Sequence, residues 1–235
     1  MSNIEKKINE SATFYSRSFL SFDYQLADFN FRVLEPYFKG KFALELGPAS
    51  GYMTKHLVKR FESLHLVEGS RELLSQIEDY PNIVKFHSLF ENFETDNRYQ
   101  TIIMSHVLEH IADPVGVLKR IHQWLDAAGV FLVSVPNARS IHRMVAVEMG
   151  LLENVYQLNE RDHQLGHYRI YDTATLVSHL EEAGFKIRET GGIFLKPLSN
   201  GQIEQQWTPE MVEGFFKAGK YFPEHCAEIF AVCEK

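Results

Sequence analysis

The sequence predicts an α/β fold built around a parallel β-sheet. Short apolar segments, each about as long as a strand, alternate with helical segments between residues 41 and 135. This alternation is typical of βαβ units. A glycine-rich turn also follows the first strand segment, and a strand, a glycine turn and a helix in succession bring backbone N–H groups close to a bound ligand. We therefore expect a ligand site at the carboxyl ends of the strands.

Residues 1 to 40 are rich in aromatic side chains, and the segment from Asp23 to Phe38 has the spacing of an amphipathic helix. We expect residues 1–40 to form an N-terminal helical cover and residues 41–235 to form the main domain. The cover either packs on the sheet without a further role or acts as a lid over a bound ligand.

Strands are expected where apolar segments recur, at Phe42–Leu46, Leu64–Val67, Ile83–His87, Thr101–Met104 and Val130–Val135. Helices are expected between them, near Tyr52–Arg60, Glu72–Glu78 and Pro114–Leu125. Pro114 suits a first helical turn, where its missing N–H would have no partner in any case.

After Asn137 the alternation is interrupted twice. A first insertion covers about residues 138–170 and contains a predicted helix at Ser140–Leu152. A helix at Thr173–Ala183, ended by Gly184, and a strand at Phe185–Glu189 then resume the pattern. A second insertion, about residues 195–221, adds a helix before the last apolar segment at 228–234.

Composition excludes several classes of protein. The chain has 235 residues, 45 % of them hydrophobic, and a formal net charge of −7. That charge argues against a phosphate-binding surface for nucleic acid. No apolar segment approaches the roughly twenty residues that span a bilayer, so we expect a cytoplasmic protein that does not bind membranes. Cys226 and Cys233 are interpreted as small core residues rather than a disulfide.

The segment from Lys41 to Thr54 indicates what the ligand is. Glu45 ends the first strand, and Gly47 and Gly51 follow it. A pyrophosphate would be repelled by this acid, whereas a cation would be attracted. Tyr52 also stands where the dinucleotide-binding fingerprint needs a third glycine, which counts against a nicotinamide-dependent oxidoreductase. Glu68 ends the second strand about twenty residues on, the distance at which an acid binds ribose hydroxyls, so the pattern favours a charged nucleoside.

Four motifs occur in a fixed order between residues 41 and 137: E-L-G-P-A-S-G, L-V-E-G-S, S-H-V-L-E-H-I-A-D-P and A-A-G-V-F-L-V-S-V-P-N. In these motifs the chain resembles class I S-adenosylmethionine-dependent methyltransferases. The resemblance implies a Rossmann-like, seven-stranded, mostly parallel sheet with an antiparallel last strand. It also implies helices on both faces and small insertions after strands 5 and 6. Two departures are Ala49 in place of the middle glycine and the lack of an acid after the third strand.

The resemblance implies S-adenosylmethionine as the cofactor. Its candidate contacts are Glu45, Gly47, Pro48, Gly51, Glu68, Gly69, Ser88, Leu89, Phe90, Ser105 and His106. Candidate contacts with the methyl acceptor are Tyr15, Tyr24, His106 and Tyr171. His106 is alternatively a wall residue that contributes backbone contacts alone, and Glu109 and His110 are expected to pack the loop that follows.

Methyl transfer is a direct displacement that depends on alignment of the acceptor with the methyl group. A hydroxyl or ammonium acceptor must also lose a proton, and histidine is the usual base. In R-D-H-Q-L-G-H-Y-R-I-Y we expect His167 to be the base, His163 to be the reserve, and Arg169 to orient the acceptor. A β-like conformation would place His167, Arg169 and Tyr171 on one face. A purely structural role for this segment remains an alternative.

A metal site formed by Asp162, His163 and His167 was the remaining alternative for this segment. Gly166 and the polar composition argue against the helix that such spacing needs, so we predict no metal. We expect methyl transfer to a small molecule, with the oxygen of a sugar or secondary metabolite slightly preferred over a small amine. A methyltransferase-like subunit without turnover is the alternative from another class, and a homodimer is left open.

Overall fold

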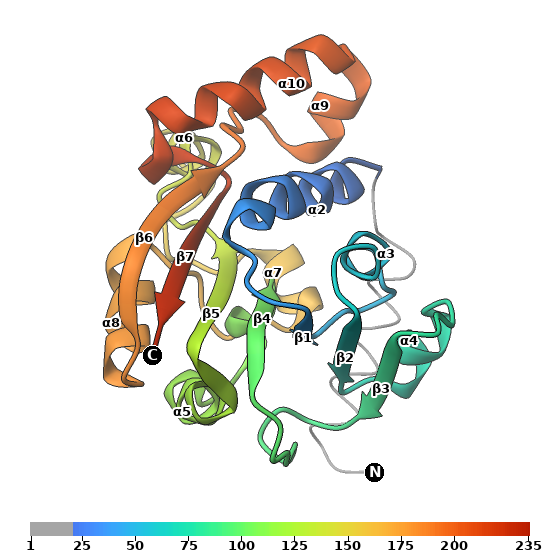
Figure 1. Ribbon diagram of the computed structural model, residues 1–235. Coiled ribbons are helices and arrows are strands. Elements are labelled where there is room, and N and C mark those ends of the chain that lie inside the picture. Colours follow the sequence, from blue (N-terminus) through green and yellow to red (C-terminus); the bar gives the residue numbers. More distant parts are fainter. Residues whose placement is uncertain (1–20) are drawn as a thin grey trace.

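A seven-stranded sheet forms the centre of the protein, in the order β3-β2-β1-β4-β5-β7-β6 (Figure 1). The computed structural model describes residues 21–235, so Tyr15 lies outside the described residues. The strands are β1 Phe42–Leu46, β2 Ser63–Glu68, β3 Ile83–His87, β4 Tyr99–Ser105, β5 Leu125–Pro136, β6 Lys186–Ile193 and β7 Glu228–Glu234. β1 to β5 pair in parallel, whereas β7 runs antiparallel to both of its neighbours. The predicted topology is confirmed.

The core lies on both faces of this sheet because successive strand residues point to opposite sides. Leu44 and Leu46 of β1 belong to one apolar cluster with Leu118, whereas Ala43 belongs to the other cluster with Leu57.

The helices are α2 Ser21–Leu34, α3 Thr54–Leu57, α4 Arg71–Gln76, α5 Pro114–Trp124, α6 Ile141–Glu148, α7 Glu160–Leu165, α8 Thr173–Glu182, α9 Asn200–Gln206 and α10 Pro209–Ala218. Short 3₁₀ helices cover Glu35–Tyr37, Leu108–His110, Gly219–Tyr221 and Pro223–His225. Among the described residues, no helix is both long and apolar enough to cross a membrane.

Helix α2 packs against helices from the other end of the chain, and Figure 1 shows it below α9 and α10. The ring of Phe29 stacks on that of Phe216 in α10, with centroids 4.3 Å apart. Both guanidinium NH groups of Arg32 donate to Glu213 at 2.8 Å.

The second insertion contains two helices, α9 and α10, one more than the sequence predicted. The division of the chain at residue 40 stays a prediction.

Helix α7 differs from the sequence-based expectation. The sequence argued against a helix around Asp162 and His163, and this is wrong, because Asn159 and Asp162 form a capping box that starts a helix over Glu160–Leu165. Asp162 N–H donates to Asn159 Oδ1 at 2.9 Å, and Asn159 N–H donates to Asp162 Oδ2 at 2.9 Å. Gly166 ends the helix with φ +83°, a conformation that suits glycine. Gly166 therefore ends the helix and does not prevent it from forming.

The remaining differences concern the extent of elements. The helix predicted near Tyr52–Arg60 is confined to Thr54–Leu57, with turns on either side. β5 begins at Leu125, earlier than predicted, and β6 continues to Ile193. Cys226 and Cys233 are buried free thiols, as the sequence indicated.

Candidate active site

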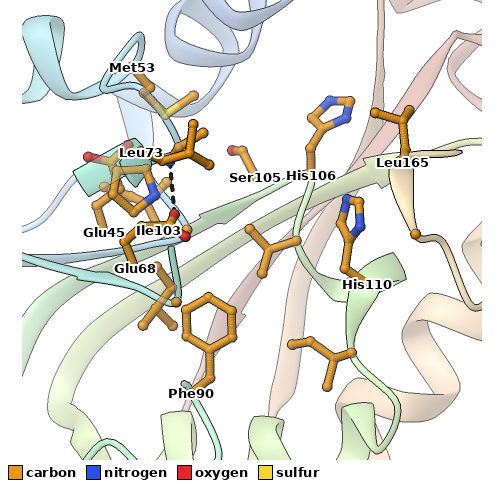
Figure 2. A pocket seen from close by; sticks show the side chains of 18 of the residues that line it. Glu45, Met53, Glu68, Leu73, Phe90, Ile103, Ser105, His106, His110 and Leu165 are labelled. Carbon is orange, nitrogen blue, oxygen red and sulfur yellow. Dashed lines mark hydrogen bonds between the residues drawn. The ribbon is translucent and has the colours of Figure 1, made fainter. Parts of the chain in front are cut away.

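A cavity of about 310 Å³ opens at the carboxyl ends of β1, β2 and β4 (Figure 2). Its wall includes nine of the residues predicted to contact the cofactor: Glu45, Gly47, Pro48, Glu68, Gly69, Leu89, Phe90, Ser105 and His106. Helix α2 contributes Asp23, Leu26, Ala27 and Asn30, and the end of α7 contributes Leu165 and Gly166. Parallel strands and a glycine turn thus converge on one enclosed volume, as expected for this class of sheet.

Positive φ angles shape the loop after β1. Gly47 has φ +69°, Ala49 +49° and Gly51 +82°. A Cβ atom on Gly47 would lie 2.4 Å from Cγ2 of Val107, and one on Gly51 would lie 3.1 Å from Ile77. Gly51 itself does not belong to the cavity wall. The glycines are therefore required by backbone conformation and by neighbouring side chains, in addition to any ligand.

Glu45 places an acid beneath this loop. Its Oε2 accepts a hydrogen bond from Thr54 Oγ1 at 2.7 Å, and 4 % of the residue is exposed. Burial raises the pKa of Glu45 to about 7, although the Thr54 hydrogen bond acts in the opposite direction. A buried carboxyl of this kind is stabilised in its charged form by a cation nearby.

Glu68 binds the backbone of the same loop from the end of β2. Its Oε2 accepts from Ala49 N–H at 3.2 Å, and its Oε1 accepts from Ser70 N–H at 2.8 Å. Burial raises the pKa of Glu68, and these N–H groups oppose the shift. Since each carboxylate oxygen has two lone pairs, the group can still accept hydrogen bonds from a ligand.

His106 lies on the other side of the cavity from Glu45 and Glu68 (Figure 2). Its Nε2 is 2.9 Å from Oε1 of Glu228, whose Oε2 accepts a hydrogen bond from Asn30 Nδ2. Asn30 Oδ1 in turn accepts from Ser134 Oγ at 2.5 Å. Burial lowers the pKa of His106, but the neighbouring carboxylates of Glu228 and Glu109 outweigh this effect and raise it to about 9. These carboxylates therefore favour the cationic form of the ring.

A second group of polar side chains lies beside His110, which lines the cavity. Glu109 is 1 % exposed, and its Oε1 is 3.9 Å from His110 Nε2 and 3.8 Å from His106 Nδ1. The His167 ring meets that of His110 edge-on, with centroids 4.6 Å apart. His167 Nδ1 is 3.1 Å from Asp162 Oδ1, within hydrogen-bonding distance.

His167, the predicted base, is not part of the cavity wall, and the other predicted site residues also lie away from it. Arg169 donates through NH1 to Ile111 O and through NH2 to Ala112 O, so it supports the loop after the second 3₁₀ helix. The hydroxyl of Tyr171 is buried and 3.2 Å from His179 Nδ1. Three further predicted residues lie outside the cavity wall: Tyr24, His163 and Ser88. Tyr24 packs on Tyr52, and His163 is exposed on α7. Ser88 Oγ donates a hydrogen bond to Leu89 O.

Sequence reasoning missed Asn30 and Glu228, and it considered Asp162 as a metal ligand but not as the partner of His167. Each carried a signal that could have been used. Asn30 is a polar residue on the apolar face of an amphipathic helix, and Glu228 is an acid at the start of an otherwise apolar strand. Asp162 follows Asn159 at the spacing of a capping box. None of these signals indicates which distant residue is the partner.

Comparison with known proteins agrees with this architecture. Residues 19–190 match the sequence profile of a methyltransferase domain. A ubiquinone biosynthesis O-methyltransferase from Aeromonas salmonicida is 22 % identical over 176 residues, which cover 68 % of this chain and 69 % of that protein.

Solved structures share the fold at low sequence identity. One is a possible histamine N-methyltransferase from Thermotoga maritima, 14 % identical, with a TM-score of 0.66 over 97 % of this chain and 99 % of that one. Another is the N-methyltransferase NodS from Bradyrhizobium japonicum in complex with S-adenosylhomocysteine, 12 % identical, with a TM-score of 0.58 over 99 % and 98 %. The profile match spans well over half of the chain, so the protein belongs to this methyltransferase domain family and is an S-adenosylmethionine-dependent methyltransferase.

Proposed function

We propose that the protein transfers the methyl group of S-adenosylmethionine to a hydroxyl group of a small molecule such as a sugar or secondary metabolite. The observation that carries this proposal is the group of imidazoles and carboxylates around His106, His110 and His167. A hydroxyl becomes a good nucleophile only as it loses its proton, and such groups can take up or disperse that proton. The O-methyltransferase relative points to the same type of acceptor.

The cofactor fits the opposite side of the cavity, where Glu45, Gly47 and Glu68 lie. We assign the ribose hydroxyls to Glu68 and the cationic part of the cofactor to the surroundings of Glu45. His106 and Ser105, at the end of β4, would then border the sulfonium and its methyl group. This orientation directs the methyl group towards His110 and the end of α7, where the acceptor would bind.

The acceptor must be small, because the cavity is covered. Asp23 and Asn30 of α2 cover one side, and Leu165, Gly166 and Tyr168 close another. His167 is the base candidate that this geometry retains, since its ring contacts that of His110. Arg169 is not retained as the acceptor-orienting residue, since its guanidinium is bound to loop carbonyls.

A small amine is a second candidate acceptor. Asp23 lines the cavity. Glu109, behind the wall residue His110, is a buried carboxylate whose oxygens accept no hydrogen bond from any described residue. A cationic ammonium group would be attracted to both. Turnover on amines but not on hydroxyl compounds would favour this alternative.

The test is methyl transfer from labelled S-adenosylmethionine to a panel of matched hydroxyl and amine compounds. We expect turnover on a hydroxyl compound, and we expect His167→Ala to lower kcat by about 10²- to 10⁴-fold with little change in cofactor affinity. His163→Ala is the matched control, because His163 is an exposed histidine on α7, just before His167 in the chain. Full activity of folded His167→Ala would contradict the role of His167. Cofactor binding without turnover on any compound would contradict the catalytic proposal itself.

A further inference from the structure

We propose that Glu109, His110 and His167 bind a divalent transition-metal cation beside the cavity, whose wall includes His110 but not the other two residues. Each residue offers one ligand atom, and these three atoms all lie within 4.8 Å of one another. Two of the residues come from the 3₁₀ helix after β4 and the third from the turn after α7. The fold therefore brings together ligands that are more than fifty residues apart in the sequence.

The carboxylate of Glu109 is the first reason. The residue is 1 % exposed, and neither Oε1 nor Oε2 accepts a hydrogen bond from a described residue. A buried carboxylate without such bonds is unfavourable unless a positive charge lies next to it. A cation between Glu109, His110 and His167 would supply this charge and occupy the vacant lone pairs.

The orientation of His167 is the second reason. Its Nδ1 lies 3.1 Å from Asp162 Oδ1, and Arg143 NH1 holds the other carboxylate oxygen at 3.4 Å. Donation from Nδ1 to a carboxylate leaves the lone pair on Nε2, which is the arrangement typical of metal-binding histidines. The capping box of α7 fixes Asp162, so the histidine is preorganised by the helix end.

The donor set indicates the kind of metal. Two imidazoles and one carboxylate suit zinc and similar transition metals, whereas magnesium prefers oxygen ligands alone. His110 Nε2 and Glu109 Oε1 are 3.9 Å apart. Ligands of a tetrahedral zinc ion lie about 3.4 Å from each other, given bonds of about 2.1 Å. A small movement of either side chain would therefore close the site, and a fourth position would remain for a ligand from the cavity.

His106 offers the competing explanation for the buried charge. Its Nδ1 is 3.8 Å from Glu109 Oε1. However, its Nε2 is closer to Oε1 of Glu228, at 2.9 Å. His106 is thus directed mainly at Glu228, whereas His110 Nε2 faces Glu109 Oε1 at 3.9 Å.

The catalytic consequence rests on the proposed function. A hydroxyl bound at the open position would ionise near neutral pH, because a bound metal strongly lowers the pKa of its oxygen ligand. The proton leaves to solvent, the oxygen takes the methyl group, and S-adenosylhomocysteine departs with the electron pair on sulfur. His167 would then act as a metal ligand rather than as the base.

The experiment is metal titration of the chelator-treated protein, without acceptor. We expect one equivalent of Zn²⁺ to bind by calorimetry, and Co²⁺ to give the visible absorption of a four-coordinate site with nitrogen and oxygen ligands. Mg²⁺ should not compete at similar concentrations. Glu109→Gln and His167→Ala should each weaken Zn²⁺ binding at least 100-fold, and Asp162→Asn should weaken it about 10- to 100-fold. The controls His163→Ala and His87→Ala remove exposed histidines and should leave the affinity unchanged.

Three results would overturn the inference: no stoichiometric binding, a six-coordinate Co²⁺ spectrum, or equal affinity in wild type and Glu109→Gln. The wild-type Co²⁺ spectrum decides the matter even where a variant fails to fold. Metal binding without turnover on any hydroxyl compound would contradict only the proposed function. Turnover by metal-free protein that binds no metal would contradict only this inference.

Discussion

At Gly47 the backbone has φ +69°, and a Cβ atom there would lie 2.4 Å from Val107 Cγ2. Two separate costs therefore oppose a side chain at this position, one from the left-handed conformation and one from overlap. Gly150 has nearly the same conformation, φ +71°, with nothing within 4 Å of the corresponding Cβ position. The chain thus contains a matched pair that separates the two costs.

We predict that Gly150→Ala lowers the free energy of unfolding by about 1 kcal/mol, the cost of the left-handed conformation. Gly47→Ala should lower it by about 3 kcal/mol, because overlap with Val107 adds to that cost. Adding Val107→Ala should recover part of the loss at Gly47 and none at Gly150. Urea unfolding measures all of these values. Equal losses at the two glycines would show that Val107 does not restrict the loop.

Glu68 gives a second prediction at this scale. Glu68→Ala should weaken binding of S-adenosylmethionine by about 2 kcal/mol or more, because charged hydrogen bonds in a buried site are lost. Calorimetric titration measures the affinity. Glu62→Ala, which removes an exposed carboxylate just before the same strand, is the control. Unchanged affinity in a folded Glu68→Ala protein would refute the ribose assignment.

Glu45, at the carboxyl end of β1, makes the free energy of unfolding depend on pH. The pKa of Glu45 is raised by burial from 4.5 to about 7, with Thr54 opposing the shift and Glu68 adding to it. Between these two values the folded protein binds more protons at Glu45 than the unfolded chain does. The free energy of unfolding contributed by Glu45 therefore falls as pH rises through this range.

We predict that Glu45→Gln stabilises the ligand-free protein at pH 8 relative to wild type, and that this gain shrinks towards pH 5. The change between the two pH values should be on the order of 3 kcal/mol, since one pKa unit corresponds to about 1.4 kcal/mol. Urea unfolding of both proteins at each pH gives the difference. If the difference in free energy of unfolding between the two proteins does not vary with pH, the pKa of Glu45 is not raised in the folded protein.

Strands were the elements best predicted from sequence. Phe42–Leu46 and Ile83–His87 have the predicted bounds, because short apolar segments next to turn residues have few other stable conformations. Helix α7 was missed because its start depends on reciprocal hydrogen bonds between Asn159 and Asp162, and hydrophobic periodicity does not report these. Local signals thus predicted the sheet better than the short polar helices.

The two sides of the site, one around Glu45 and Glu68 and the other around His106 and His167, also differ in how well the sequence predicts them. The sequence could predict that Glu45, Gly47 and Glu68 lie together at one cavity, because they belong to ordered motifs close together in the chain. The other side depends on Asn30, Glu228 and Asp162, which come from α2, β7 and α7. Only the folded topology brings these elements together, so no single segment of sequence indicates the pairing.

At the scale of the whole molecule, the cover of the cavity is held by segments far apart in the chain. Helix α2 contributes Leu26 and Asn30 to the cavity wall, and the ring of Phe29 in the same helix stacks on Phe216 of α10. We therefore expect the affinity for the cofactor to depend on contacts between α2 and α10 that lie outside the cavity wall.

We predict that Phe216→Ala weakens binding of S-adenosylmethionine about tenfold, which corresponds to a loss of about 1.4 kcal/mol in the ordering of α2. Hydrogen exchange of residues 22–34 should accelerate in the same variant. The control is Tyr221→Ala, because Tyr221 is an aromatic residue that is 70 % exposed. If Phe216→Ala binds the cofactor as wild type does, the stacking on α10 does not hold the cover.

The order of strands at one edge of the sheet also affects protein synthesis. β7 follows β6 in the chain but lies between β5 and β6, and it pairs with both. A nascent chain that has not reached residue 228 therefore leaves the apolar strand β5 with an open edge and β6 without a neighbour. Open edges can pair with other chains. Until residues 228–234 have been synthesised, the growing polypeptide therefore carries an incomplete sheet whose β5 edge is open to pairing with other chains.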